Sequence, residues 1–283
     1  MTSFLQYLLH TFENTGIQLL ILVVPLLILA FAMNFVSLIT QRWAVGLFGY
    51  RAWLIIFKAV GTPIHELGHA IFCILFGHRI EKISLFNPAP DGTLGYVEHC
   101  YNRRNIYHQV GNFFIGMGPV IFGCVVITLA ALLLVGGQVF TPIQPFANGL
   151  SLAPFNLGSF LNSLGATLTA IFKGIFQPSN FHHWQFYIFL YLVFTIGNSI
   201  TLSPSDLYSA GLGFLFFVLF LLVLNGVTGW MGDFLIKGTM GLNPILIQFE
   251  ILVLVALFLN ILVAIVILVL LLFKRLLQAV FSR

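Results

Sequence analysis

Long uninterrupted apolar runs are the feature that most limits what this chain can fold into. Residues 244–273 contain a single charged side chain, Glu250. About 20 apolar residues are enough for an α-helix to cross the hydrocarbon core of a bilayer, whereas the strand of a membrane barrel needs only about 9–11. The run at 244–273 therefore predicts a transmembrane helix rather than a barrel strand.

Composition extends this prediction to the whole chain. Charged residues make up 7% of the 283 residues, against about 25% in a typical soluble domain, and 59% are hydrophobic. A soluble fold of this length needs more charge to cover its surface. The formal net charge of +4 comes from 12 Lys and Arg spread over loops and termini, where they act as topology signals. We therefore expect an integral, multi-pass membrane protein embedded in a lipid bilayer, with no nucleic-acid partner.

The expected fold is an all-α polytopic membrane protein of about six transmembrane helices. The predicted spans are 17–38, 53–76, 113–135, 186–202, 212–227 and 244–273. The pattern divides the chain into an N-terminal helix with its interfacial connector, a core, and a C-terminal helix with a basic tail. These units are expected at 1–51, 52–227 and 228–283.

Two connectors have patterns of their own. The segments "EKISLF" and "TLGYV" contain strand-forming residues and flank the turn-forming "NPAPDG", so we expect a short membrane-associated β-hairpin at about 80–98, after the second span. Residues 156–176 place apolar side chains at helical spacing among Ser, Asn and Thr. That pattern predicts a helix lying in the membrane interface.

Loop charges predict the orientation of the chain. With both termini in the cytoplasm, seven basic residues face the cytoplasm and four face outside. The seven flank the hairpin or lie in the tail: Arg79, Lys82, Arg103, Arg104, Lys274, Arg275 and Arg283. The four are Arg42, Arg51, Lys173 and Lys237. The expected location is the cytoplasmic membrane of a bacterium or an archaeon.

The second predicted span contains the polar sequence "HELGH" at 65–69. His65 and His69 are four residues apart, so a helix places both imidazoles on one face, about 6 Å apart along its axis. That spacing suits two ligands of a tetrahedral Zn²⁺, and Glu66 can reach a zinc-activated water as general base. The alternative is a set of satisfied polar residues in the core of a bundle. Ionisable groups inside a membrane are costly and usually functional, which favours the metal site.

A catalytic zinc site needs a third protein ligand, and the chain offers few acidic candidates. Asp206 lies in "GNSITLSPSDLYSAG", at the break between the fourth and fifth spans. Pro204 can turn this segment back into the bundle, on the side of the motif. Glu250, the acidic residue of the last span, lies on the far side in this topology. We therefore predict Asp206 as the third ligand; the alternative is a helix N-cap for the fifth span.

These motifs together resemble the site-2 protease family of intramembrane zinc metalloproteases. The matching pieces are "HELGH" at 65–69, "GMGPVIFG" at 116–123, "NSITLSPSD" at 198–206 and a hairpin after the motif helix. Leu207 stands where the family usually has Gly after the aspartate, and an apolar residue replaces the usual Asn after the Gly-Pro pair. The resemblance implies zinc binding by His65, His69 and Asp206, with Glu66 as general base. It also implies that Asn198 contacts the substrate backbone; an interhelical hydrogen bond is the alternative.

The predicted function is zinc-dependent endoproteolysis of transmembrane protein substrates, as in regulated intramembrane proteolysis. Selection would then rest on the membrane core, the hairpin, the 156–176 segment or a regulatory membrane partner. Two other classes stay open. A zinc-binding but inactive membrane scaffold would carry the same ligands, and a solute or metal permease would need polar residues along several spans.

Overall fold

The computed structural model describes residues 4–142, 157–232 and 234–281, and most of them are helical. The helices before the hairpin are α1 (Phe4–Leu22), α2 (Val24–Phe48), α3 (Tyr50–Trp53), the π-helix η1 (Leu54–Lys58) and α4 (Gly61–Leu75). The hairpin strands are β1 (Arg79–Ser84) and β2 (Tyr96–Cys100). The helices that follow are α5 (Ile106–Leu134), η2 (Gly137–Phe140), α7 (Leu157–Ile175), η3 (Pro178–His182), α8 (Trp184–Gly197), α9 (Pro204–Thr228), η4 (Gly229–Met231), α10 (Phe234–Gly241) and α11 (Asn243–Phe281).

Four helical segments in the described ranges are long and apolar enough to cross a bilayer: Phe4–Phe48, Ile106–Leu134, Pro204–Met231 and Asn243–Phe281. They coincide with the first, third, fifth and sixth predicted spans. The second and fourth predicted spans fall on α4 and α8, which have 15 and 14 residues. At 1.5 Å per residue these helices are shorter than the roughly 30 Å hydrocarbon core. The all-helical membrane fold is therefore supported, whereas the count of six spans is not confirmed.

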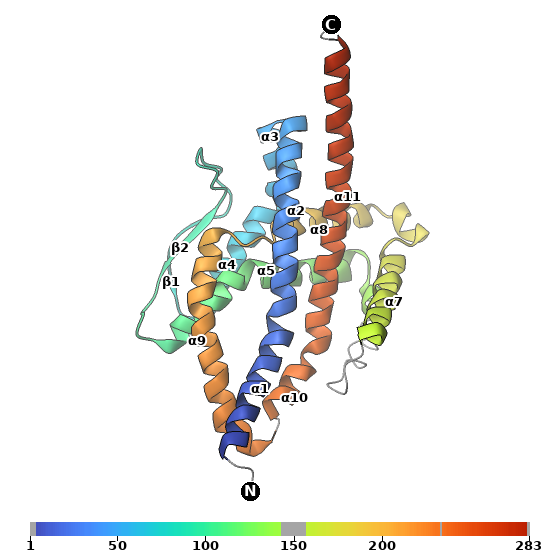
Figure 1. The fold of residues 1–283 in the computed structure, drawn as a ribbon. Helices are drawn as coiled ribbons and strands as arrows, with labels where there is room; N and C mark the ends of the chain where they lie inside the picture. The colour runs from blue at the N-terminus through green and yellow to red at the C-terminus, as the bar shows by residue number, and fades with distance from the viewer. Residues whose placement is uncertain (1–3, 143–156, 233, 282–283) are drawn as a thin grey trace.

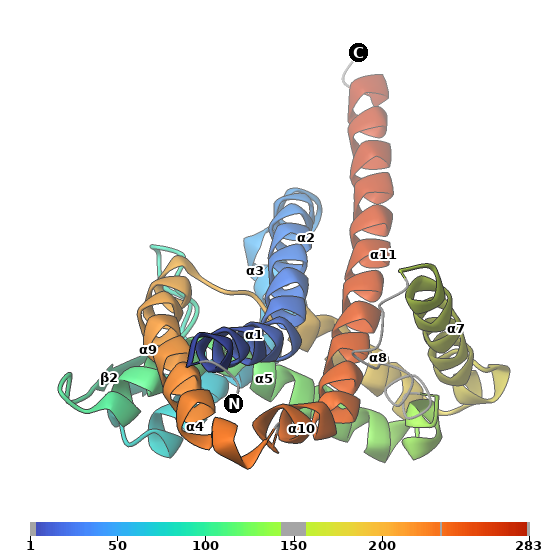
Figure 2. The ribbon, with the colours of Figure 1, turned by 60° about the horizontal axis from the view of Figure 1, so that its bottom comes forward.

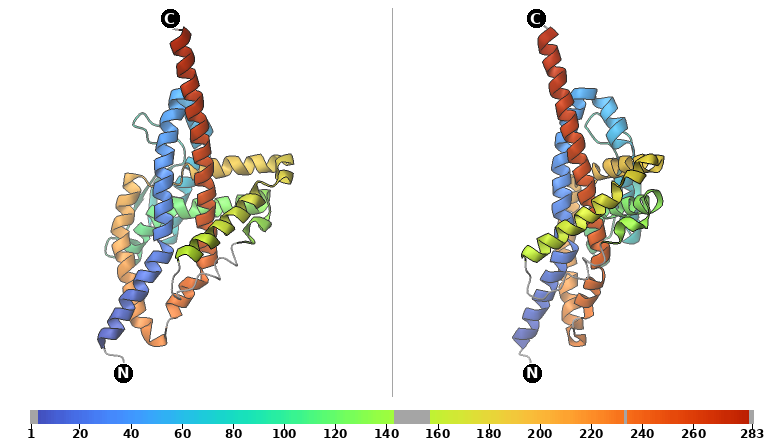
Figure 3. Two further views of the ribbon diagram at one scale, coloured as in Figure 1. Left: turned by 45° about the vertical axis from the view of Figure 1, so that its right-hand side comes forward. Right: turned by 90° about the vertical axis from the view of Figure 1, so that its right-hand side faces the viewer.

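The long helices do not all share one direction. In Figure 1, α2 and α11 run along the long axis of the molecule, with the N-terminus at the lower end and the C-terminus at the upper end. Figure 3 shows α5 and α8 running across that axis. The start of α1 and the end of α11 thus lie at opposite ends of the molecule, whereas the loop charges predict both termini on one side of the membrane.

A contact between α11 and the end of α2 also contradicts the predicted topology. The ammonium of Lys274 donates to the carbonyl oxygens of Gly46 and Leu47, at 3.3 and 3.2 Å. The charge count places the connector at 41–51 outside and the basic tail in the cytoplasm, but these segments lie together. The expected alternation assumes that every apolar run crosses the membrane once. The crossing orientation of α5 and α8 breaks that assumption.

The predicted hairpin is confirmed, with its strands shifted by a few residues. β1 and β2 pair antiparallel, with Ile83 opposite Val97 and Ile80 opposite His99, and the register is irregular between Ile80 and Lys82. The turn between the strands contains Asp91, whose carboxylate accepts from the Thr93 amide at 2.9 Å. This turn lies at the upper end of the molecule, near α3, and the strands flank α4 (Figure 1).

The core that holds the site consists of α4, α5 and α9, and both α4 and α9 pack closely on α5. The rings of Phe113 on α5 and Phe217 on α9 stack with centroids 4.9 Å apart. Gly68 of the motif helix lies against the backbone of Gly118 and Pro119 on α5, where a Cβ atom would come within 2.8 Å of backbone atoms. The glycine lets α4 and α5 approach closely enough for His69 on α4 to reach the α5 backbone.

We predict that Gly68→Ala destabilises the protein by about 1–3 kcal/mol, because the added methyl group would force α4 and α5 apart. Thermal unfolding of the purified protein in detergent measures this loss. Gly165→Ala on α7 is the matched control, since a Cβ atom there meets nothing within 4 Å. An unchanged melting temperature for Gly68→Ala would contradict the close packing of α4 on α5.

The predicted interfacial segment is a helix in this structure. α7 covers 157–175 of the expected 156–176, and residue 156 lies outside the described residues. Ile171 and Ile175 are fully buried and belong to the main hydrophobic core. In Figures 1 and 2, α7 and the hairpin lie on opposite sides of the molecule. In this arrangement α7 therefore does not contact the hairpin.

The lower end of the molecule is held by polar contacts between helices. Figure 2 shows α10 joining the lower ends of α9 and α11, and α1 packs against α9 and α10. The amide of Asn225 donates to Thr15 Oγ1 at 3.0 Å and to Gln18 Oε1 at 2.7 Å. Gln18 in turn donates to Thr239 Oγ1 at 3.3 Å. These side chains are buried and bonded to one another, which is how polar groups join helices in an apolar environment.

Candidate metal centre

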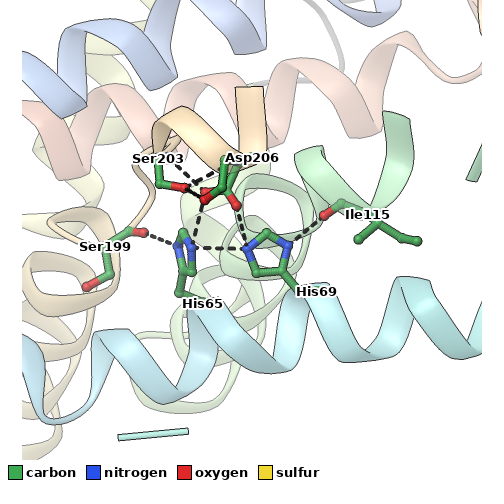
Figure 4. A network of polar contacts seen from close by, with 7 residues as sticks. His65, His69, Ile115, Ser199, Ser203 and Asp206 are labelled. Atoms are coloured by element: carbon green, nitrogen blue, oxygen red, sulfur yellow. Dashed lines mark hydrogen bonds and ion pairs between the residues drawn. The ribbon is translucent and has the colours of Figure 1, made fainter. Parts of the chain in front are cut away.

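The motif helix α4 brings its two histidines together as the i, i+4 spacing predicts. The Nε2 atoms of His65 and His69 lie 3.2 Å apart, and the two rings meet nearly edge to face (Figure 4). His69 is buried and His65 is half-buried. Both Nε2 atoms face the first turn of α9, as Figure 4 shows.

Backbone carbonyls fix the tautomer of both rings. His65 Nδ1 lies 2.8 Å from the carbonyl oxygen of Ser199, and His69 Nδ1 lies 2.8 Å from that of Ile115. A carbonyl oxygen only accepts, so each Nδ1 must carry the proton and donate it. In the neutral rings both Nε2 atoms then present lone pairs, the form in which imidazole binds a metal.

The two carbonyls are available because the backbone around them lacks its usual helical partners. Ile115 lies in α5 four residues before Pro119, and proline has no N–H to donate to the carbonyl four residues earlier. Ser199 lies in the segment between α8 and α9, where the helix has ended. The Gly-Pro pair of "GMGPVIFG" thus serves His69 in two ways: Gly118 allows close packing, and Pro119 frees the carbonyl that orients the ring.

Asp206 completes the cluster from the first turn of α9. Its Oδ1 lies 3.2 Å from His69 Nε2, and its Oδ2 lies 3.6 Å from His65 Nε2. Oδ2 also accepts from the Ser203 amide at 2.8 Å, while the Ser203 hydroxyl accepts from the Asp206 amide at 3.2 Å. This reciprocal capping box starts α9 and holds the carboxylate in place. The capping alternative expected Asp206 as the N-cap, but the N-cap is Ser203, and Asp206 contributes to the cap from position N3. One carboxylate can serve as both a capping group and a metal ligand.

The donor set fits a zinc ion. One ligand atom from each of His65, His69 and Asp206 lies within 4.8 Å of the others. Two lone pairs and a carboxylate face one another at distances where acceptors repel, so a cation between them resolves the conflict. Two imidazoles and a carboxylate are a known ligand set for catalytic zinc, which keeps a further position open. The structure brings the three predicted ligands together, and their role in holding zinc remains a prediction.

Glu66 lies beside the cluster in a shared cavity. A cavity of about 390 Å³ is bounded by α4, the hairpin and the first turn of α9, and its walls include His65, Glu66, His69 and Asp206. The Glu66 side chain is 6% exposed. Within the described residues, its carboxylate forms no hydrogen bond, so it is free to act on a molecule in the cavity. Gly95 of the hairpin lies so close that a Cβ atom there would meet Glu66 Cγ at 2.7 Å.

Asn198, the predicted substrate contact, does not line this cavity. Its side chain is 1% exposed, donates to Asn260 Oδ1 at 3.1 Å and accepts from the Ser37 hydroxyl at 3.3 Å. Its carbonyl oxygen accepts from the Lys58 ammonium at 2.8 Å. These contacts match the interhelical alternative: Asn198 ties α2, α8 and α11 together next to the break that carries Ser199.

Two histidines at the base of the hairpin were not among the predicted site residues. His99 on β2 lines the cavity, and its Nδ1 lies 3.0 Å from Nδ1 of His78. His78 donates from Nε2 to the His108 carbonyl at 2.9 Å, so its Nδ1 accepts from His99. Burial lowers the pKa of His78 to about 4 and keeps the ring neutral. The two histidines are 21 residues apart, and no sequence pattern predicts their contact because it depends on how the strands of the hairpin pair.

Sequence signals existed for two other residues that the prediction missed. Pro119 stands inside an apolar span, where a proline frees a carbonyl. Lys58 is a cation in a predicted span, and such residues are rare and usually functional. The structure places both next to the groups that orient the histidines.

A chain of apolar helices that buries a His-His-Asp cluster beside a glutamate has the features of a membrane metallopeptidase. Residues 27–136 match the model of the family described as Peptidase M50B-like. The matched residues include the "HELGH" motif and the hairpin. This match supports membership of the site-2 protease family, as the resemblance in the sequence predicted. No curated protein and no solved structure matches the chain.

Proposed function

We propose that the protein is an intramembrane zinc metalloprotease that cleaves transmembrane segments of other membrane proteins. The observation that carries the proposal is the convergence of two histidine lone pairs and the Asp206 carboxylate beside Glu66, in one cavity. Zinc bound by these three residues would polarise a peptide carbonyl and lower the pKa of a water molecule. Each protein group then has one role in peptide hydrolysis.

Glu66 acts as the general base. It accepts a proton from the attacking water and returns a proton to the leaving amine, which completes the hydrolysis. Its position beside the cluster, without a hydrogen-bond partner among the described residues, leaves the carboxylate available for both transfers. The carbonyls of Ser199 and Ile115 keep His65 and His69 in the tautomers that bind the metal.

The hairpin is proposed to hold the substrate. A transmembrane helix hides its carbonyls in internal hydrogen bonds and must unwind locally before one can be attacked. Residues 92–97 of the hairpin line the cavity, and in the described chain the sheet has two strands only, so each strand has an unpaired edge. An unwound segment can add to such an edge as a further strand, next to Glu66.

The proposal is tested by reconstituting the purified protein in vesicles with a panel of single-span membrane proteins. We expect at least one to be cut inside its apolar span, with the position located by mass spectrometry. A chelator should abolish the cleavage, and added Zn²⁺ should restore it. Absence of cleavage across a broad panel by zinc-loaded protein would favour the inactive scaffold.

The side of the membrane is a separate proposal. The turn of the hairpin, the end of α2 and the α11 segment with Lys274 lie toward the upper end in Figure 1. Arg42, Arg51, Lys274 and Arg275 belong to this end, and Lys237 on α10 belongs to the other. Three further basic residues lie at the open end of the hairpin, away from its turn: Arg79, Arg103 and Arg104. Because positive residues concentrate on the cytoplasmic side, we propose that the upper end faces the cytoplasm.

This orientation predicts opposite labelling of two introduced cysteines. In a background without Cys73, Cys100 and Cys124, Asp91→Cys in the hairpin turn should resist a membrane-impermeant thiol reagent added to intact cells. Met231→Cys, between α9 and α10, should react readily, because Met231 is exposed at the opposite end. The reverse pattern would overturn the orientation.

A further inference from the structure

A buried lysine lies next to the catalytic cavity and has no role in the mechanism above. Lys58 is the last residue of η1, a π-helix directly before the motif helix, and its side chain is 8% exposed. π-Helical turns are rare and frequently mark functional sites. A buried ammonium normally pairs with an acid. Among the residues that the structure describes, Lys58 forms no ion pair. Its ammonium donates to the Asn198 carbonyl at 2.8 Å and lies over the Trp53 ring, 5.9 Å from the ring centroid.

Lys58 borders a second cavity that continues the first. This chamber, of about 140 Å³, shares His65, Glu66, Gly95 and two further residues with the catalytic cavity. The volume is well above the ~10–15 Å³ that a single water needs. We call this second cavity the Lys58 chamber. The four residues that line it alone are Lys58, Thr62, Ser199 and Thr201.

The Lys58 chamber offers hydrogen-bond donors and a positive charge. Of the four residues that line this chamber alone, Thr62, Ser199 and Thr201 have side chains that end in hydroxyl groups. Ser199 is only 6% exposed, and its buried hydroxyl has no hydrogen-bond partner within the described chain. An ammonium with protons to spare and hydroxyl groups that line the same chamber can together bind an anion.

We propose that the Lys58 chamber binds a carboxylate of the substrate or product. This inference rests on the proposed function. Peptide hydrolysis consumes one water, breaks the C–N bond, and leaves a carboxylate on one fragment and an amine on the other. The new carboxylate forms beside Glu66 and Asp206, which repel it. The ammonium of Lys58, in the adjoining chamber that Glu66 also borders, attracts it and offsets this repulsion.

A purely structural role for Lys58 makes a different prediction. Lys58 and Ser37 both donate to the Asn198 carbonyl, and the next residue, Ser199, orients His65. If Lys58 only holds this segment, its loss lowers zinc content and thermal stability but does not change how the protein distinguishes an acid from an amide.

The test measures binding of two short probes to the purified full-length protein in detergent: N-acetyl-Leu-Leu with a free carboxylate, and the same dipeptide as a carboxamide. We expect the wild type to bind the acid about 10-fold more tightly or better, as charge-assisted hydrogen bonds allow. Lys58→Met should remove this preference. Lys173→Met, the same change at an exposed lysine on α7, should retain it. An equal affinity of the wild type for both probes would overturn the proposal.

Metal-free protein separates the Lys58 chamber from the zinc site, since a carboxylate can also bind zinc. After chelation, the acid preference should persist in the wild type and be weaker in Ser199→Ala, which deletes the unpartnered hydroxyl but keeps the carbonyl that holds His65. A preference that disappears with the metal, or that survives in Lys58→Met, would place the carboxylate elsewhere and overturn the assignment. If Lys58→Met fails to fold, the wild-type and Ser199→Ala measurements still decide.

A third probe identifies the source of the carboxylate. N-acetyl-Leu-Asp-amide carries its acid on a side chain, whereas N-acetyl-Leu-Leu carries it at the chain end. If N-acetyl-Leu-Asp-amide binds in a Lys58-dependent way, the chamber recognises acidic substrates. If N-acetyl-Leu-Leu does so, the chamber captures the product. These measurements need no proteolysis, so a failure of the proposed function in the vesicle assay and a failure of this site are distinguishable.

Discussion

Glu66→Gln is expected to keep a near-normal zinc content and to lower the rate of substrate cleavage about 10²–10⁴-fold, the range typical for loss of a general base. Gln has the size of Glu, so the close contact with Gly95 of the hairpin and the packing of α4 are preserved. Glu66 lies beside the His65, His69 and Asp206 cluster without belonging to it. An amide cannot accept a proton at neutral pH, so the chemical step alone should suffer.

The measurement pairs metal analysis with cleavage of a reconstituted transmembrane substrate. Glu250→Gln, the same change on α11, is the matched control and should cleave like the wild type. We also expect Glu66→Gln to retain intact substrate, since the ligands and the hairpin are unchanged. Equal behaviour of the wild type and Glu66→Gln toward every substrate, with zinc in both, is the result that the inactive scaffold predicts.

Local patterns in the sequence predicted the parts of the site that depend on local geometry. The i, i+4 spacing of His65 and His69 fixes their common helix face, and the turn residues of "NPAPDG" fix the hairpin. Asp206 could be found because the chain has only eight acidic residues, so elimination left few candidates. The capping alternative named Asp206 itself as the N-cap, whereas Ser203 is the N-cap and Asp206 closes the capping box at N3.

Features that depend on tertiary packing were beyond the same reasoning. Hydropathy measures the length and apolarity of a helix but not its direction, so it did not reveal that α5 and α8 cross the long axis. Loop charges treat each span as one crossing and therefore separated Lys274 from Gly46, which are in contact. The neighbours of Asn198, Asn260 and Ser37, could not be derived from the sequence, because they depend on how α2 and α11 pack beside α8.

The two carboxylate oxygens of Asp206 have different partners, and this difference predicts what Asp206→Asn does to zinc binding. Oδ2 is engaged by the Ser203 amide, whereas Oδ1 approaches His69 Nε2. Asp206→Asn can keep the cap, since an amide oxygen accepts the Ser203 hydrogen bond. It loses the negative charge that offsets the cation. If Asp206 is a ligand, α9 should remain folded while zinc binding fails.

We therefore expect Asp206→Asn to weaken zinc affinity by more than the 10–100-fold that loss of an outer-shell partner typically costs, and to abolish cleavage. Ser203→Ala makes the complementary change: it removes one half of the capping box, which should cost about 0.5–2 kcal/mol of stability, but leaves all three ligands. Zinc titration and thermal unfolding of both variants separate the two roles. Full zinc stoichiometry and unchanged affinity in Asp206→Asn would show that Asp206 is only a cap. The third ligand would then have to come from another residue, and the assignment of His65, His69 and Asp206 as one metal centre would fail.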